Sequence, residues 1–119
     1  MDKQQRKALL AEARKIKTYF GVVRVTNTQN GKAFIAAFPN LKNKWWSIKM
    51  QLEVGRYANA ALQADWKQYG EAAFTYEVLE EHDATDITDM KWELAQMLKP
   101  WLERLSPYGE RGYNREPKA

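Results

Sequence analysis

The sequence contains no cysteine and a single histidine, His82, and these scarcities remove several classes of site. Without cysteine there is no disulfide scaffold, no cysteine-ligated zinc, no iron–sulfur cluster and no thiol catalysis. One histidine excludes a histidine-rich metal site. Any chemistry must therefore come from carboxylates, tyrosine, lysine and arginine.

Long apolar runs are also absent. No stretch approaches the roughly 18 residues that a membrane span needs. The charged amino terminus, MDKQQRKALLAEARKIK, lacks the apolar stretch of a signal peptide. We therefore expect a cytoplasmic protein with no membrane partner. The 119 residues, 45% of them hydrophobic and 29% charged, fit one globular domain.

The net charge of +4 hides a difference between the two halves of the chain. Residues 1–60 hold 12 basic and 3 acidic side chains, whereas residues 61–119 hold 7 basic and 12 acidic ones. A basic half indicates a nucleic acid or another polyanion as partner. Charge alone leaves a solvated basic helix equally open.

Apolar periodicity first predicts an amphipathic basic helix over residues 3–17. The aromatic and β-branched run 19–26 then indicates a strand, and Asn30-Gly31 indicates a hairpin turn before a returning strand at 32–37. We treat residues 1–17 as an additional amino-terminal helix and residues 18–119 as the domain.

Two helices are expected after the hairpin. Asn40 can cap the first, which ends at Gly55, and the second spans about residues 59–69 and stops at Gly70. The apolar stripe of the first helix consists of Leu41, Trp45, Ile48 and Leu52.

The remaining segment predicts a third strand and a long helix. Phe74, Tyr76 and Val78 alternate with polar residues, as in a strand packed on one face. An acidic turn at 80–86 leads into a helix whose apolar stripe runs from Ile87 to Leu105, and Pro100 should kink it rather than end it. The tail from Ser106 should be a loop lying over the domain. The fold class is therefore α+β, with a small, mostly antiparallel three-stranded sheet flanked by helices.

From about Thr18 to Asn114 the chain resembles a GIY-YIG nuclease domain. The resemblance rests on the order and spacing of its motifs, because no single motif is specific. They are Gly21-Val22-Val23, NTQNGKAFIA, PNLKNKWWSIKMQLEVG, ALQADWKQYGEAAFTYEVLEE, the helix containing Glu93, and Gly112-Tyr113-Asn114.

The resemblance implies phosphodiester cleavage with one divalent metal held by a glutamate. In the family, a tyrosine of the first motif helps to activate the attacking water, and the tyrosine of the second motif lies nearby. An arginine on the first helix steadies the phosphate charge. The family's site positions fall on Val23, Phe34, Lys44, Ile48, Tyr57, Glu93 and Asn114. The resemblance makes Glu93 the candidate metal ligand, with Mg²⁺ or Mn²⁺ as the cofactor if cleavage is retained.

Several of these positions have lost the family's chemistry. Val23 and Phe34 cannot accept or donate a proton, and Ile48 cannot replace the histidine that some members have. Lys44 keeps the charge of the arginine but loses its bidentate fork. Glu93, Asn114 and Tyr57 retain polar groups. A nuclease of the usual mechanism is therefore not expected.

Helical geometry places the two charged candidates near one cleft. Glu93 lies about 100° from Leu94, the centre of its apolar stripe, and so borders the sheet. A metal ligand and an ordinary boundary glutamate both fit that position. Lys44 lies about 60° from its own stripe, so we expect it to emerge beside the cleft that Glu93 borders.

Basic residues of the first half form the candidate nucleic-acid surface. Trp46 would add a stacking platform unless the amino-terminal helix covers it. The candidate nucleic-acid-binding residues are Lys42, Lys44, Lys49, Arg56, Arg24, Lys32 and Trp46.

Three functional hypotheses follow. The first is a nucleic-acid-binding protein, with DNA as the expected partner, on a GIY-YIG fold with weakened or lost cleavage. The second is an active metal-dependent endonuclease that uses Glu93 and Lys44. The third is a protein-interaction module or a homodimer that associates through the amino-terminal helix.

Overall fold

The computed structural model describes residues 3, 5–6 and 17–116. Most of the basic helix expected over residues 3–17 lies outside the described residues. Lys3, Gln5 and Arg6 are helical and exposed. Within the described part of the chain, no helix is long and apolar enough to cross a membrane.

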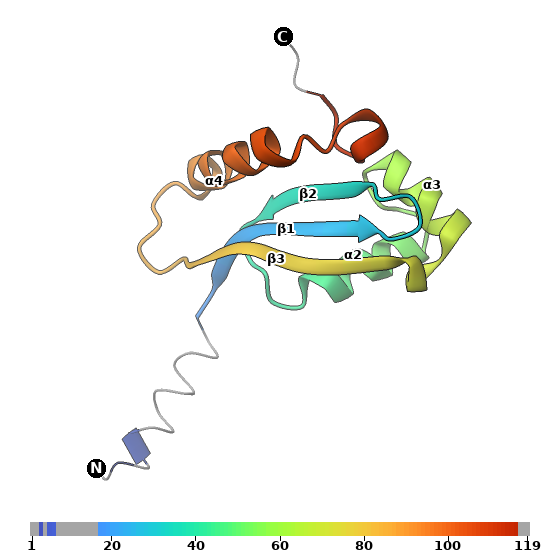
Figure 1. Cartoon of the computed structure of the whole chain (residues 1–119). Helices are drawn as coiled ribbons and strands as arrows, with labels where there is room; N and C mark the ends of the chain where they lie inside the picture. The colour runs from blue at the N-terminus through green and yellow to red at the C-terminus, as the bar shows by residue number, and fades with distance from the viewer. Residues whose placement is uncertain (1–2, 4, 7–16, 117–119) are drawn as a thin grey trace.

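One antiparallel sheet forms the centre of the described domain, with strand order β2-β1-β3 (Figure 1). The central strand therefore pairs on both sides. The strands are β1 (Tyr19–Asn27), β2 (Ala33–Phe38) and β3 (Phe74–Asp83). The hairpin prediction is confirmed, since the turn closes with Asn27 N donating to Lys32 O at 2.8 Å and with Gly31 at a φ of 78°.

Helices lie on both faces of this sheet (Figure 1). The helix α4 packs against β1 and β2 on one face, while α2 and α3 contribute to the hydrophobic core on the other. Short 3₁₀ segments, η1 (Glu71–Ala73) and η2 (Gly109–Arg111), lead into β3 and into the tail. The helices are α2 (Lys44–Glu53), α3 (Ala60–Tyr69) and α4 (Met90–Leu105).

The helix predictions are confirmed in part. The helix α3 begins after Asn59, whose side chain accepts from Leu62 N, and ends at Gly70. The helix α4 continues past Pro100 to Leu105. The start predicted for α2 is wrong, because Asn43 and not Asn40 precedes it. The side chain of Asn40 instead accepts from Lys42 N, which forms a turn before the helix.

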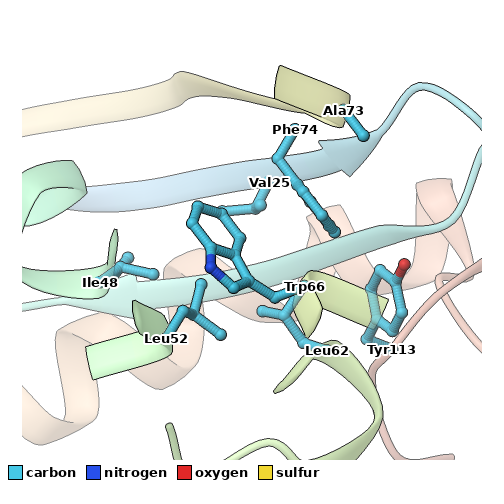
Figure 2. Packing of buried hydrophobic residues seen from close by; sticks show 8 residues of the cluster. All are labelled: Val25, Ile48, Leu52, Leu62, Trp66, Ala73, Phe74 and Tyr113. Atoms are coloured by element: carbon cyan, nitrogen blue, oxygen red, sulfur yellow. The ribbon is translucent and has the colours of Figure 1, made fainter. Parts of the chain in front are cut away.

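The main hydrophobic core lies between the sheet and the helices α2 and α3 (Figure 2). Alternation along β1 places Val23 and Val25 on this face and Phe20 and Val22 on the α4 face. The cluster consists of Val25, Ile48, Leu52, Leu62, Trp66, Ala73, Phe74 and Tyr113.

A β-bulge in β3 changes which residues face α4. Val22 pairs with Glu80 and Val23 pairs with Val78, so Leu79 has no partner across the ladder. The extra residue reverses the alternation, and Glu80 therefore faces α4 although Val78 faces the other way.

The prediction of an acidic turn at residues 80–86 is wrong for residues 80–83, which belong to a strand. β3 continues to Asp83, which pairs with Tyr19. Backbone hydrogen bonds along β1 outweigh the weak strand preference of these acidic residues.

Gly21 accommodates the bulge. A Cβ atom at this position would clash with the carbonyl oxygen of Glu80, which leaves no room for a side chain. The glycine of the first motif thus has a steric role in this chain, independent of any chemistry.

We predict that Gly21→Ala lowers the free energy of unfolding by about 3 kcal/mol, since the clash is with backbone that cannot move alone. Urea unfolding of the full chain measures it. Gly55→Ala is the control, because Gly55 has a φ of +76° and open space around it. That variant should cost only about 1 kcal/mol of backbone strain. Equal losses in the two variants would contradict the steric role.

Candidate nucleic-acid interface

A cleft of about 610 Å³ lies among β2, α2, the start of α3 and the carboxy-terminal tail. It brings together five of the seven positions that the resemblance singled out: Phe34, Lys44, Ile48, Tyr57 and Asn114. The remaining lining includes Phe38, Gln51, Asn59 and Arg115. We refer to this as the α2–α3 cleft.

Lys44 is a cation without a carboxylate partner among the described residues. Its Nζ atom lies 4.2 Å from the centre of the Phe38 ring, and the residue is half-buried. This cation–π contact orients the ammonium group while leaving its three donors available. Lys44 can therefore attract an anion into the cleft.

Tyr57 forms an aromatic wall of the cleft with Phe34. The two rings meet edge to face, with centroids 6.0 Å apart and an interplanar angle of 89°. Burial raises the pKa of Tyr57 to about 12. The hydroxyl is therefore protonated at neutral pH, and it can donate a hydrogen bond but cannot act as a general base.

Asn114 holds the tail against the edge strand β2. Its Oδ1 atom accepts from Ile35 N at 2.9 Å, and its Nδ2 atom donates to Ile35 O at 2.7 Å. Asn114 N also donates to Pro107 O at 3.1 Å. These bonds occupy the side-chain amide, so the structure gives Asn114 a positioning role at the cleft.

Tyr113 fixes the same tail from the other side. Its backbone N donates to Ala33 O at 2.9 Å, and its hydroxyl donates to Asp65 at 2.6 Å. Burial and the hydrogen bond to Asp65 raise the pKa of Tyr113 to about 12. Asn59 Nδ2 also donates to Tyr113 O at 2.8 Å. These hydrogen bonds hold the backbone next to Arg115 in place, and Arg115 lines the cleft.

Sequence reasoning missed Arg115, Phe38 and Gln51. Arg115 directly follows the Gly112-Tyr113-Asn114 motif, so its proximity to Asn114 was a usable signal. Phe38 and Gln51 reach the cleft only because β2 and α2 face each other across it. Local patterns do not contain that information.

Val23 and Glu93 do not line the α2–α3 cleft. Val23 is fully buried and pairs with Ala36 and Val78. Glu93 lines a different cleft on the α4 face, together with Phe20, Glu80 and His82 among others. The expectation that Lys44 and Glu93 border one cleft is therefore wrong, because α2 and α4 lie on opposite faces of the sheet.

The separation of Glu93 from Lys44 bears on whether the described residues can hold a divalent metal beside a phosphate. No group of three or more His, Asp or Glu side chains among the described residues is arranged to hold a metal ion. The carboxylate of Glu93 also lies apart from Lys44, the position expected to hold the phosphate. Because Glu93 and the expected phosphate contact line different clefts, these donors do not fit the family's arrangement of one glutamate beside the phosphate, and the role of Glu93 as a metal ligand stays a prediction.

The other candidate nucleic-acid contacts are unequal in availability. Lys42 and Arg56 are exposed at the two ends of α2, and Trp46 is 63% exposed on its outer side. Lys49 instead pairs with Glu71 at 3.1 Å, and Lys32 lies over the Tyr113 ring.

Arg24 forms an ion pair with Glu77 on the α4 face, away from Lys44. On the α2–α3 side, Lys42, Lys44, Arg56 and Arg115 are cations that form no ion pair with a described carboxylate.

Two solved structures are similar to this chain. One is a mutant of the catalytic domain of intron endonuclease I-TevI, with 23% identity, a TM-score of 0.67, and coverage of 81% of this chain and 92% of that one. The other is the catalytic domain of homing endonuclease I-TevI, with 22% identity, a TM-score of 0.66, and coverage of 82% and 99%. The chain has the GIY-YIG nuclease fold.

The assignment of the GIY-YIG fold therefore rests on the similarity of the three-dimensional structures. No family model matches the sequence, and no curated protein matches it either. At this identity the similarity establishes the three-stranded antiparallel sheet with its helices, and the chemistry must be argued from the clefts themselves.

We predict that acid weakens the packing of α4 through Glu80. His82 and the Trp101 indole N–H each lie 2.8 Å from its carboxylate, and these hydrogen bonds lower the pKa of Glu80 below its usual 4.5. The stabilisation is present above pH 4.5 and is lost as the pH falls through the lowered pKa. Glu80→Gln should flatten this loss in urea unfolding measured across pH, whereas Glu103→Gln, an exposed control on α4, should not.

We also predict that Asn114→Ala costs about 1–3 kcal/mol, because Ile35 loses both partners at the sheet edge. Urea unfolding gives the loss, and amide hydrogen exchange should accelerate selectively at Ile35 and Tyr113. Asn40→Ala, which removes one turn hydrogen bond far from the tail, is the control. Unchanged exchange at Ile35 in Asn114→Ala would contradict the positioning role.

Proposed function

We propose that this protein binds nucleic acid, with DNA as the expected partner, through the α2–α3 cleft, and that phosphodiester cleavage is weakened or lost. The observation that carries the proposal is that Lys44 and Arg115 line the same cleft, while none of the described carboxylates lines it. Cations without a neutralising partner attract phosphate and release its counterions.

Neutral donors in the cleft add to this attraction. The Tyr57 hydroxyl stays protonated at neutral pH and can donate to a phosphate oxygen. Ala60 and Ala61 also line the cleft, and they are the first two residues of α3. Backbone N–H groups at a helix start favour an anion.

The similarity to two endonuclease domains supports a nucleic-acid partner, since an endonuclease must hold the strand that it cuts. The basic first half of the chain also supports a nucleic-acid partner, because residues 1–60 contain 12 basic and 3 acidic side chains. The exposed cations at both ends of α2 extend the cleft into a wider basic surface.

Two features support the loss of cleavage. Val23 and Phe34 offer no group for proton transfer at the two positions that the family's tyrosines occupy. Glu93 lies on the far side of the sheet from Lys44, so its carboxylate and the proposed phosphate contact do not share a cleft. The chain retains a phosphate-binding surface without the neighbouring acid and base.

The test measures binding and cleavage together. Labelled single- and double-stranded DNA and RNA are incubated with the protein in Mg²⁺, Mn²⁺ or EDTA over a salt series. We predict salt-dependent binding without cleavage. Lys44→Ala should weaken binding about tenfold and reduce the slope of log K against log salt by about 1.

Lys99→Ala on α4 is the matched control, since it removes the same charge from an exposed site outside the cleft. It should leave affinity and salt slope near the wild-type values. Metal-dependent cleavage that disappears in Glu93→Ala would overturn the proposal in favour of an active endonuclease. If the protein neither binds nor cleaves any of these nucleic acids, the proposal is overturned in favour of a protein partner.

A further inference from the structure

The α2–α3 cleft is larger than a phosphate group needs. Its volume of about 610 Å³ lies within the range of pockets that enclose whole small molecules. We infer that it holds one unpaired nucleotide of the bound strand, with the base inside and the phosphate at Lys44 and Arg115. This inference rests on the proposed function and specifies the form of its ligand.

Aromatic side chains supply surfaces for a base. Phe34, Phe38 and Tyr57 line the cleft from two different parts of the chain. Phe34 and Tyr57 meet edge to face, and such a contact covers one face of only one of the two rings. All three rings are partly buried against the core, and the ring surfaces that line the cleft can stack with any base, because every base has a π-face.

Polar groups next to the rings can contact the edge of a base. Among the described residues, the Gln51 side chain makes only one long hydrogen bond, from Nε2 to Ser47 Oγ at 3.3 Å, so its Oε1 atom is available. The Tyr57 hydroxyl has no hydrogen-bond partner among the described residues. An amide offers both a hydrogen-bond donor and an acceptor, and the edge of a base also carries both kinds of group.

The positions of the charges fit a nucleotide rather than a free base. Lys44 lies over one face of Phe38, with its ammonium group 4.2 Å from the ring centre. Arg115 approaches from the tail that Tyr113 and Asn114 hold in place. Cations therefore stand beside the aromatic surfaces, as a sugar–phosphate linked to a stacked base requires.

A regular duplex cannot supply this ligand, because its bases are paired and stacked inside the helix. A base reaches a cleft only from a single strand, a bulge, a gap or after being flipped out. The structure therefore predicts a preference for nucleic acid with at least one unpaired nucleotide over a continuous duplex.

The experiment compares three oligonucleotides of equal length: a single strand, a duplex with one bulged 2-aminopurine, and the continuous duplex. We expect the first two to bind about tenfold more tightly than the duplex. The fluorescence of the 2-aminopurine should fall on binding, because stacking on an aromatic ring quenches it. Inorganic phosphate and a deoxynucleoside monophosphate serve as small competitors, and the monophosphate should compete better.

Two variants localise the effect. Tyr57→Ala should abolish most of the preference, while Tyr57→Phe, which keeps the ring, should retain it. Tyr69→Ala, at the end of α3 and outside the cleft, is the aromatic control. Since Tyr57 packs against the core, Gln51→Ala provides a second probe at an exposed residue, and it should reduce discrimination among bases.

The outcomes separate the two proposals. Equal affinity for all three oligonucleotides, with no quenching and no effect of Tyr57→Ala, would overturn the unpaired-nucleotide inference and leave phosphate binding intact. No binding of any oligonucleotide would overturn the proposed function itself. Preference for the unpaired forms that survives Tyr57→Ala in a folded protein would place the base elsewhere and also overturn the inference.

Discussion

The double hydrogen bond between Asn114 and the backbone of Ile35 is the constraint on which the cleft depends. It joins the carboxy-terminal tail to β2, which would otherwise leave its outer backbone groups unpaired at the edge of the sheet. Tyr113 adds bonds to Ala33 and Asp65, so the tail is fixed at several points. Asn114, which the resemblance places at a catalytic position of the family, thus helps to form a wall of the α2–α3 cleft.

The second constraint is the separation of charges by the sheet. The bulge at Leu79 and the close approach at Gly21 direct Glu80 towards α4, where it accepts from Trp101. The acidic residues Glu80, Asp83 and Glu93 all line the cleft on that face. Lys44 and Arg115 line the α2–α3 cleft on the other face, and none of the described carboxylates lines that cleft. This arrangement supports the proposal that the protein binds nucleic acid without cleaving it.

Much of the fold could be predicted from the sequence, because its signals were local. The aromatic and β-branched run 19–26, the Asn30-Gly31 turn and the helix stop at Gly70 each depend on a few neighbouring residues. The start of α2 and the extent of β3 could not be predicted in this way. Asn40 and Asn43 are both good capping residues, and β3 continues to Asp83 only because β1 pairs with it.

The site was predictable to a smaller extent. The resemblance selected five residues that do line one cleft, including Lys44 and Tyr57. A helical wheel gave the angle of Glu93 from its stripe, but it could not tell which face of the sheet α4 covers. The bulge that reverses β3 has no sequence signal as strong as Asn-Gly. The placement of Glu80 and Glu93 on the face opposite Lys44 is therefore visible only in the three-dimensional structure.

The most direct test of nucleic-acid binding at this cleft is an NMR titration of the isotopically labelled protein with a short single-stranded DNA. If the cleft binds DNA, the largest chemical-shift changes should fall on Lys44, Gln51, Tyr57 and Arg115, and they should decrease as salt is added. Shifts concentrated around Glu93 and His82 on the α4 face, or no shifts at saturating DNA, would contradict nucleic-acid binding at this cleft.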